Sequence, residues 1–222
     1  MTHKLIVFLD YANIDHTATN RGLSLDYGAL LNYLAEGRFL AEAHVFVPRD
    51  PHAPYTRDRA IEDLWQQGYL VHDKIGIPRG DSYKCDFDVE ITLEMMRSAE
   101  LAHPDIVVLA SGDGDFLPVA RELRRRAIRV EVAAFPEHVA RNLRLQASGY
   151  INLERWIQEI SDSEKTEDTA IGSSENEKTD DRIHAQEIPA ANDFSIPTAR
   201  VWSDDRNRFL KESTTSCVES VN

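Results

Sequence analysis

Residues 106–116 read IVVLASGDGDF: five apolar residues are followed by a Ser-Gly turn and by two aspartates, Asp113 and Asp115, that flank a glycine. A short, continuous run of aliphatic residues predicts a strand that is buried on both faces of a sheet. Two like charges placed directly after such a strand repel each other. A solvated turn would account for them, and a metal site would account for them better if further carboxylates reach the same place.

Strand-like and helix-like segments alternate on both sides of this stretch. Runs such as LIVFL (5–9) are typical of buried strands, and apolar residues at helical spacing, as in LDYGALLNYLAE (25–36), indicate helices between them. This alternation predicts an α/β fold around an open, mainly parallel sheet of about five strands. We expect strands at 5–9, 44–47, 69–71, 106–110 and 128–134, and helices at 25–36, 57–67, 88–101, 116–126 and 137–146.

The composition of the chain changes after residue 160. The next residues, SDSEKTEDTAIGSSENEKTDD (161–181), are rich in Ser, Thr, Asp and Glu and poor in aromatic and branched aliphatic side chains. Such a segment cannot bury enough apolar surface to offset the entropy of ordering it. We therefore expect one domain at 1–160 and a largely disordered tail at 161–222. Within the tail, IPTARVWSDDRNRFL (196–210) could dock on a protein partner, on a second copy or on the domain, or have no role.

Charge and cysteine content exclude several classes of protein. Of the formal net charge of −13, about −6 falls in residues 1–160 and −7 in the tail, so any binding of nucleic acid needs a local basic face and a metal. Cys85 and Cys217 form neither a disulfide framework nor a metal-ligand pattern, and the eight histidines lack the spacing of a zinc site.

Because the apolar run near the N-terminus is only five residues long, we expect no membrane association and a cytoplasmic location.

Four aspartates stand where the predicted sheet would bring them together. Asp10 comes directly after LIVFL, Asp113 and Asp115 follow the strand quoted above, and Asp88 begins a predicted helix. The carboxyl ends of parallel strands share one edge of a sheet, and ligands bind there near a topological switch point. Taken singly, Asp88 and Asp115 could instead cap helices and Asp113 could be a turn residue. Asp10 is harder to dismiss, because a charge after five apolar residues is costly unless it is paired or binds a metal.

Converging carboxylates repel one another, and a hard divalent cation relieves that repulsion. Mg²⁺ and Mn²⁺ prefer oxygen ligands, and Mg²⁺ keeps several waters, so two to four aspartates at an open edge suit them. Such a site can activate a water for attack on a phosphodiester and stabilise the leaving oxygen. The pattern therefore predicts metal-dependent phosphodiester hydrolysis.

Three stretches together carry a family resemblance: FLDYANI (8–14), KCDFDVEITLEMM (84–96) and VLASGDGDFLPVARELRRRAIRV (108–130). In this order they resemble the NYN domains, LabA-like branch, of the PIN-like nuclease superfamily, over about residues 4–155. The resemblance implies a Rossmann-like (PIN-like) three-layer fold with a central, mainly parallel sheet. It also implies a Mg²⁺- or Mn²⁺-dependent ribonuclease site.

The resemblance assigns roles position by position. It matches Asp10, Asp88, Asp113 and Asp115 to acids that bind the metal and act in catalysis, with Asn13 and Ser111 as hydrogen-bonding residues beside them.

The chain departs from its relatives around the helix acid. Lys84-Cys85 stands where relatives commonly have Lys-Gly, and Asp86 is an additional carboxylate whose role stays open. Glu94 matches an acid of some relatives. Because it lies six residues beyond Asp88, about 240° around a helix, we expect a surface residue.

Contacts to the substrate are less sharply indicated. Lys84, next to the helix acid, could bind a phosphate or balance the acids. Arg121 and Arg125 belong to the densest basic stretch, which could equally be a solvated helix face. Tyr11 could stack on a base, although packing is the more usual role of such a residue.

The preferred function is that of a metal-dependent endoribonuclease acting on RNA, most simply single-stranded RNA. The alternative is a catalytically silent RNA-binding or regulatory NYN module, which would have no chemical need to keep all four acids. A phosphatase of the haloacid dehalogenase type would need a second acid two residues after Asp10, where the chain has Ala12.

Overall fold

The computed structural model describes residues 2–160. The predicted disordered tail at 161–222 and its docking segment at 196–210 lie outside these residues. The strands are β1 (Lys4–Asp10), β2 (Phe39–Arg49), β3 (Leu70–Ile75), β4 (Ile77–Arg79), β5 (Ser82–Lys84), β6 (Ile106–Ala110), β7 (Arg129–Ala134) and β8 (Gly149–Asn152). The helices are α1 (Tyr11–Asn20), α2 (Tyr27–Ala35), α3 (Asp58–Gln66), α4 (Asp88–Leu101), the 3₁₀ helix η1 (Gly114–Phe116), α5 (Leu117–Arg125) and α6 (Arg141–Gln146), and residues 153–160 are also helical.

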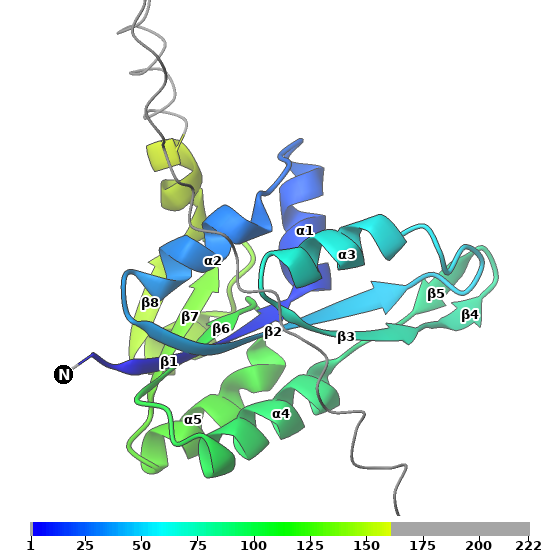
Figure 1. Cartoon of the computed structure of the whole chain (residues 1–222). Helices are drawn as coiled ribbons and strands as arrows, with labels where there is room; N and C mark the ends of the chain where they lie inside the picture. The colour runs from blue at the N-terminus through cyan, green and yellow to red at the C-terminus, as the bar shows by residue number, and fades with distance from the viewer. Residues whose placement is uncertain (1, 161–222) are drawn as a thin grey trace, which may run out of the picture. The chain divides into compact units, whose positions relative to one another are not determined.

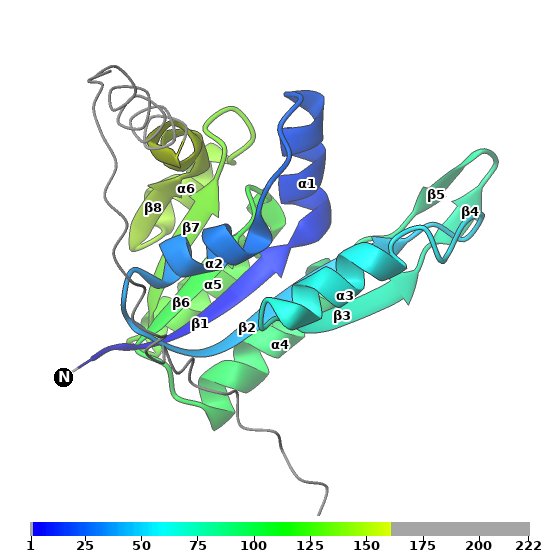
Figure 2. The ribbon, with the colours of Figure 1, turned by 45° about the horizontal axis from the view of Figure 1, so that its top comes forward.

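The main sheet within residues 2–160 has six parallel strands in the order β3-β2-β1-β6-β7-β8 (Figure 1). The strand order runs outward from β1 to β2 and β3 on one side and from β6 to β7 and β8 on the other. The gap between the carboxyl ends of β1 and β6 is therefore a topological switch point, the place where open α/β sheets bind ligands. A separate antiparallel hairpin, β4–β5, extends past the end of β3 (Figure 2).

Helices cover both faces of this sheet, which confirms the predicted three-layer α/β fold. In β1, Leu5, Val7 and Leu9 face α1, α2 and α3, whereas Ile6 and Phe8 face α4 and α5 (Figure 1). Because β1 is covered on both sides, its sequence is a continuous apolar run and does not alternate with polar residues. The same holds for β6, all five of whose residues are buried.

Several elements differ from the prediction. Helix α1, the hairpin and β8 were not expected, and the helix expected at 137–146 begins only at Arg141, so the prediction was wrong for 137–140. Residues 136–140 form turns because the backbone packs against the loop after β6, where the N–H of Ala140 donates to the carbonyl of Gly112 at 2.8 Å. The main sheet also has one strand more than expected.

No helix within residues 2–160 is both long and apolar enough to cross a membrane.

The core position of Phe8 gives a direct test of this packing. Phe8 is fully buried and stacks on His44 with ring centroids 4.9 Å apart. We expect Phe8→Ala to lower the free energy of unfolding by about 3–5 kcal/mol, because a large cavity would open beside β1. Phe39→Ala is the matched control: Phe39 is 56% exposed and should cost less than about 1 kcal/mol. Urea denaturation measures both, and equal losses would contradict the assigned core.

Candidate functional site

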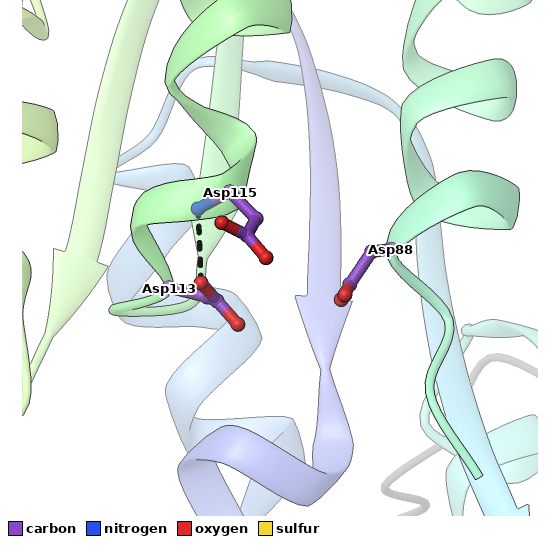
Figure 3. Close-up of side chains that lie close together, drawn as sticks. All are labelled: Asp88, Asp113 and Asp115. Carbon is purple, nitrogen blue, oxygen red and sulfur yellow. Dashed lines mark hydrogen bonds between the residues drawn. The ribbon is translucent and has the colours of Figure 1, made fainter.

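Three of the four predicted acids form a compact group, here called the acidic cluster: Asp88, Asp113 and Asp115. Each offers one carboxylate oxygen, and these oxygens lie within 4.8 Å of one another. Asp88 points from the start of α4 toward the two aspartates on the loop that follows β6 (Figure 3). The group is the one set of three or more potential ligand side chains that residues 2–160 bring close enough to hold a metal ion.

The loop after β6 fixes the Asp113 and Asp115 pair. Asp113 is the N-cap of η1, and its Oδ1 accepts a hydrogen bond from the backbone N–H of Asp115 at 2.9 Å (Figure 3). The expectation that Asp115 caps the following helix was therefore wrong. A short 3₁₀ turn intervenes, so α5 begins after Phe116 without a side-chain cap and with proline in its first turn. The capping group is Asp113, one oxygen of which is committed to the turn.

Asp88 occupies the first turn of α4. The N-cap position belongs to Phe87, which makes no side-chain capping bond, so the capping alternative for Asp88 was also wrong. Burial raises the pKa of the Asp88 carboxyl, and the nearby charges of Asp113, Asp86 and Asp115 raise it further, while Lys84 lowers it. The charged form of Asp88 is thus held in a place that other carboxylates make unfavourable. A bound cation would remove that penalty.

Asp10 lies in the same cleft but outside the acidic cluster. It ends β1 and caps α1: one oxygen accepts from the N–H of Asn13 at 3.2 Å and the other from the hydroxyl of Ser111 at 3.1 Å. Burial raises the pKa of Asp10 from an ordinary 3.8 to about 6. The two hydrogen bonds oppose this shift, and the charges of Asp88 and Asp113 add to it.

Asn13 and Ser111 connect the ends of β1 and β6. The Asn13 side-chain oxygen accepts from the N–H of Gly112 at 2.9 Å, and the fully buried Ser111 hydroxyl accepts from the N–H of Asp113 at 3.2 Å. These contacts hold the loop that carries Asp113 against the start of α1. The role of both residues in supporting a metal-bound site stays a prediction.

Gly112 is required by a close approach of the backbone. A Cβ at this position would lie 2.1 Å from the carbonyl oxygen of His138, far inside van der Waals contact. The turn after β7 therefore packs directly on the loop of the acidic cluster, and this packing brings His138 to the site.

A cleft of about 360 Å³ opens at the switch point. The sequence did not indicate two of its lining residues, His16 and His138. His16 lies one turn beyond Asn13 on α1, a helix that was not predicted, and His138 lies in a segment predicted as helix. The lining consists of Asp10, Ala12, Asn13, His16, Thr17, Cys85, Asp86, Phe87, Asp88, Asp113 and His138.

Asp86 and Lys84 form an exposed ion pair of 2.9 Å at the border of this cleft. The pairing lowers the pKa of Asp86. Asp86, whose role the sequence left open, lines the cleft without joining the acidic cluster.

The other candidates lie elsewhere. The Arg121 Nε donates to the Gln146 side chain at 2.5 Å and Arg125 contacts Glu122 at 3.4 Å, and neither arginine lines the cleft, so their part in RNA binding stays a prediction. Glu94 pairs with Arg97 at 2.6 Å, outside the acidic cluster. Tyr11 is buried against Tyr27, with ring centroids 5.1 Å apart, which is a packing role.

Comparison with known proteins identifies the family. The model of the NYN domain matches residues 4–154. The chain belongs to the NYN domain family. It is 26% identical over 171 residues to the Low amplitude and bright protein LabA of Synechococcus elongatus, a match that covers 74% of this chain and 91% of LabA and supports a place in the LabA-like branch.

Two further similarities are less informative about function. A crystal structure of a protein of unknown function from Vibrio parahaemolyticus superposes with a TM-score of 0.58 and 25% identity, over 68% of this chain and 93% of that one. NAD kinases of Neisseria meningitidis are 34% identical over 85 residues. That stretch covers 37% of this chain and only 28% of the kinases, too little to extend their activity to this NYN domain.

The raised pKa of Asp10 makes the stability of the metal-free protein depend on pH. The Asp10 carboxyl ionises near 3.8 in the unfolded chain and near 6 in the folded one, so the folded state holds the extra proton between these values. This contribution to stability is complete below about pH 4 and is lost as the pH rises through about 6, up to roughly 3 kcal/mol. With EDTA present, we expect Asp10→Asn to be more stable than the wild type at pH 7.

Urea denaturation at pH 5 and pH 7 of both proteins isolates this effect. His72, whose pKa burial lowers, acts in the opposite direction but is common to both proteins and cancels in the comparison. If the free energy of unfolding changes equally between pH 5 and pH 7 in the wild type and in Asp10→Asn, Asp10 is not the group that makes stability depend on pH.

Proposed function

We propose that this NYN domain is a metal-dependent ribonuclease that hydrolyses the phosphodiester bonds of single-stranded RNA at the acidic cluster. The observation that carries the proposal is the convergence of Asp88, Asp113 and Asp115, with oxygens within 4.8 Å of one another, at the switch point of a parallel sheet. Membership of a family within the PIN-like superfamily, whose members are usually nucleases, supports it.

The residues present fit a hard divalent cation. The acidic cluster supplies only carboxylate oxygens from two separate elements, α4 and the loop after β6, and Mg²⁺ and Mn²⁺ prefer such ligands. The like charges that raise the pKa of Asp88 would be neutralised at the same time. When bound, the ion supplies activation of a water and stabilisation of the leaving oxygen.

The surrounding residues position this chemistry. Asp10, held by Ser111 and by the N–H of Asn13, borders the acidic cluster and adds a fourth carboxylate from the first strand. The ammonium of Lys84, now paired with Asp86, is exposed beside the cleft and can exchange that partner for an RNA phosphate. Arg121 and Arg125 would contact more distant parts of the RNA.

A catalytically silent RNA-binding or regulatory module is the second candidate. The relative matched over 91% of its length, the Low amplitude and bright protein LabA, has a name that describes no reaction. The two functions share the fold and the cleft, and they differ in whether the acidic cluster turns substrate over.

Replacement of one acid distinguishes the two functions. We expect the purified protein to cleave single-stranded RNA when Mn²⁺ or Mg²⁺ is added, and Asp113→Asn to lower the rate by roughly 100-fold or more, since removing even the residues behind metal ligands costs 10–100-fold. Asp105→Asn is the matched control. Asp105 accepts from the N–H of Lys4 at the opposite edge of the sheet, so this change should leave the rate unchanged.

Gel-based cleavage of end-labelled RNA and Mn²⁺ binding are measured on the same preparations. Activity that persists in Asp113→Asn would exclude the acidic cluster as the site. A wild type that binds Mn²⁺ but cleaves no RNA of a broad panel would favour the silent module. Single-stranded DNA in parallel tests the preference for RNA.

A further inference from the structure

Two imidazoles, His16 and His138, lie in the cleft without a role in the proposed metal site. Their neighbours in the lining include four carboxylates, Asp10, Asp86, Asp88 and Asp113. No lysine or arginine is among the lining residues, so the two histidines are the only side chains of the cleft that can carry a positive charge. An RNA phosphate that enters this cleft meets several like charges. Besides the metal and Lys84 at the border, these two side chains are groups that can receive it.

The geometry argues against a metal-ligand role for the histidines. The group of side chains close enough to hold an ion consists of three aspartates and includes no histidine among the described residues. Imidazole nitrogen is also a poorer ligand than carboxylate oxygen for the ions that suit this site. Both imidazoles therefore stay available to a substrate.

Helix α1 places the imidazole of His16 in the lining of the cleft. Asn13, His16 and Thr17 share one face of α1, and all three line the cleft. The Asn20 side-chain amide lies 3.2 Å from Nδ1 of His16. The same amide nitrogen lies 3.4 Å from Nε2, so either ring nitrogen can carry the proton that is donated to an anionic oxygen.

His138 is held by the backbone around it. Its N–H donates to the carbonyl of Phe135 at 3.1 Å, and its own carbonyl packs against Gly112, the residue before Asp113. The position of His138 is thus coupled to the loop that carries the acidic cluster. Its side chain is exposed, so a ligand in the cleft can reach it.

We infer that His16 and His138 bind backbone phosphates of the RNA strand in the cleft beside the acidic cluster. This inference rests on the proposed function for the identity of the ligand. His16 belongs to the helix after the first strand and His138 to the turn after β7, so the two donors come from separate elements that line the cleft. Imidazole N–H groups donate to phosphate oxygens in either protonation state of the ring, which makes both residues phosphate contacts.

Binding is measured apart from turnover in the full-length protein. With Asp113→Asn as the background, fluorescence anisotropy of a labelled single-stranded RNA gives affinities for His16→Ala, His138→Ala and both together. Each single change should weaken binding about tenfold, the cost of losing one hydrogen bond to a charged group. The double change should approach the product if the two sites are independent.

The controls separate phosphate contact from other roles. His52→Ala is the matched variant, because His52 is also exposed, pairs with Asp50 and does not line the cleft, and it should bind RNA as the parent does. Mn²⁺ affinity should be the same in all histidine variants with Asp113 intact, and circular dichroism should show the same fold. A loss of Mn²⁺ affinity in either histidine variant would overturn the assignment.

The two proposals fail in different ways. Weaker RNA binding in the histidine variants supports the phosphate contacts even if the wild type hydrolyses nothing. RNA affinity that is unchanged in both single variants, or the absence of RNA binding in the parent, overturns the phosphate contacts. If RNA affinity is unchanged in both single variants, hydrolysis of RNA by the wild type in the presence of Mn²⁺ would still support the nuclease.

Discussion

The site depends on the link between the carboxyl ends of β1 and β6. Two hydrogen bonds make this link, from Ser111 to Asp10 and from the N–H of Gly112 to Asn13. Because β1 and β6 are neighbouring parallel strands whose crossover connections leave in opposite directions, nothing in the sheet itself closes the gap beyond their ends. The two hydrogen bonds join the strand ends at this gap, and the carboxylates of Asp10, Asp88 and Asp113 line the cleft that opens there.

This arrangement holds carboxylates in a place where burial and mutual repulsion disfavour their charged forms. Burial is the largest cause that raises the pKa of Asp10 to about 6, despite two hydrogen bonds, and it is also the largest cause that raises the pKa of Asp88. The like charges add to both shifts, so the folded chain holds these carboxylates at the expense of its stability. Such a cost is characteristic of functional sites. It would have no purpose in a solvated turn, where the acids could separate into water.

The sequence predicted those parts of the site that depend on strands buried on both faces. LIVFL and IVVLA are continuous apolar runs because helices cover both sides of the sheet, and their ends locate Asp10, Asp113 and Asp115. Helix α1 escaped detection because YANIDHTATN is polar apart from Tyr11, Ile14 and two alanines, and its start is set by the Asp10 cap. The capping role of Asp113 depends on a 3₁₀ turn that leaves no mark in the pattern.

In the proposed function, helix α1 supplies the acidic domain with a donor for an anion. Because Asp10 caps α1, the same carboxylate that borders the acidic cluster also fixes the helix face that carries Asn13 and His16. Moving Asp10 would therefore displace a donor together with an acid. The chain does not need a large basic surface for this purpose, since donors placed at the walls of the cleft act at short range, where screening by salt is weak. The end of β1 thus positions both an acidic group of the site, Asp10, and the α1 side chains that can donate to a phosphate.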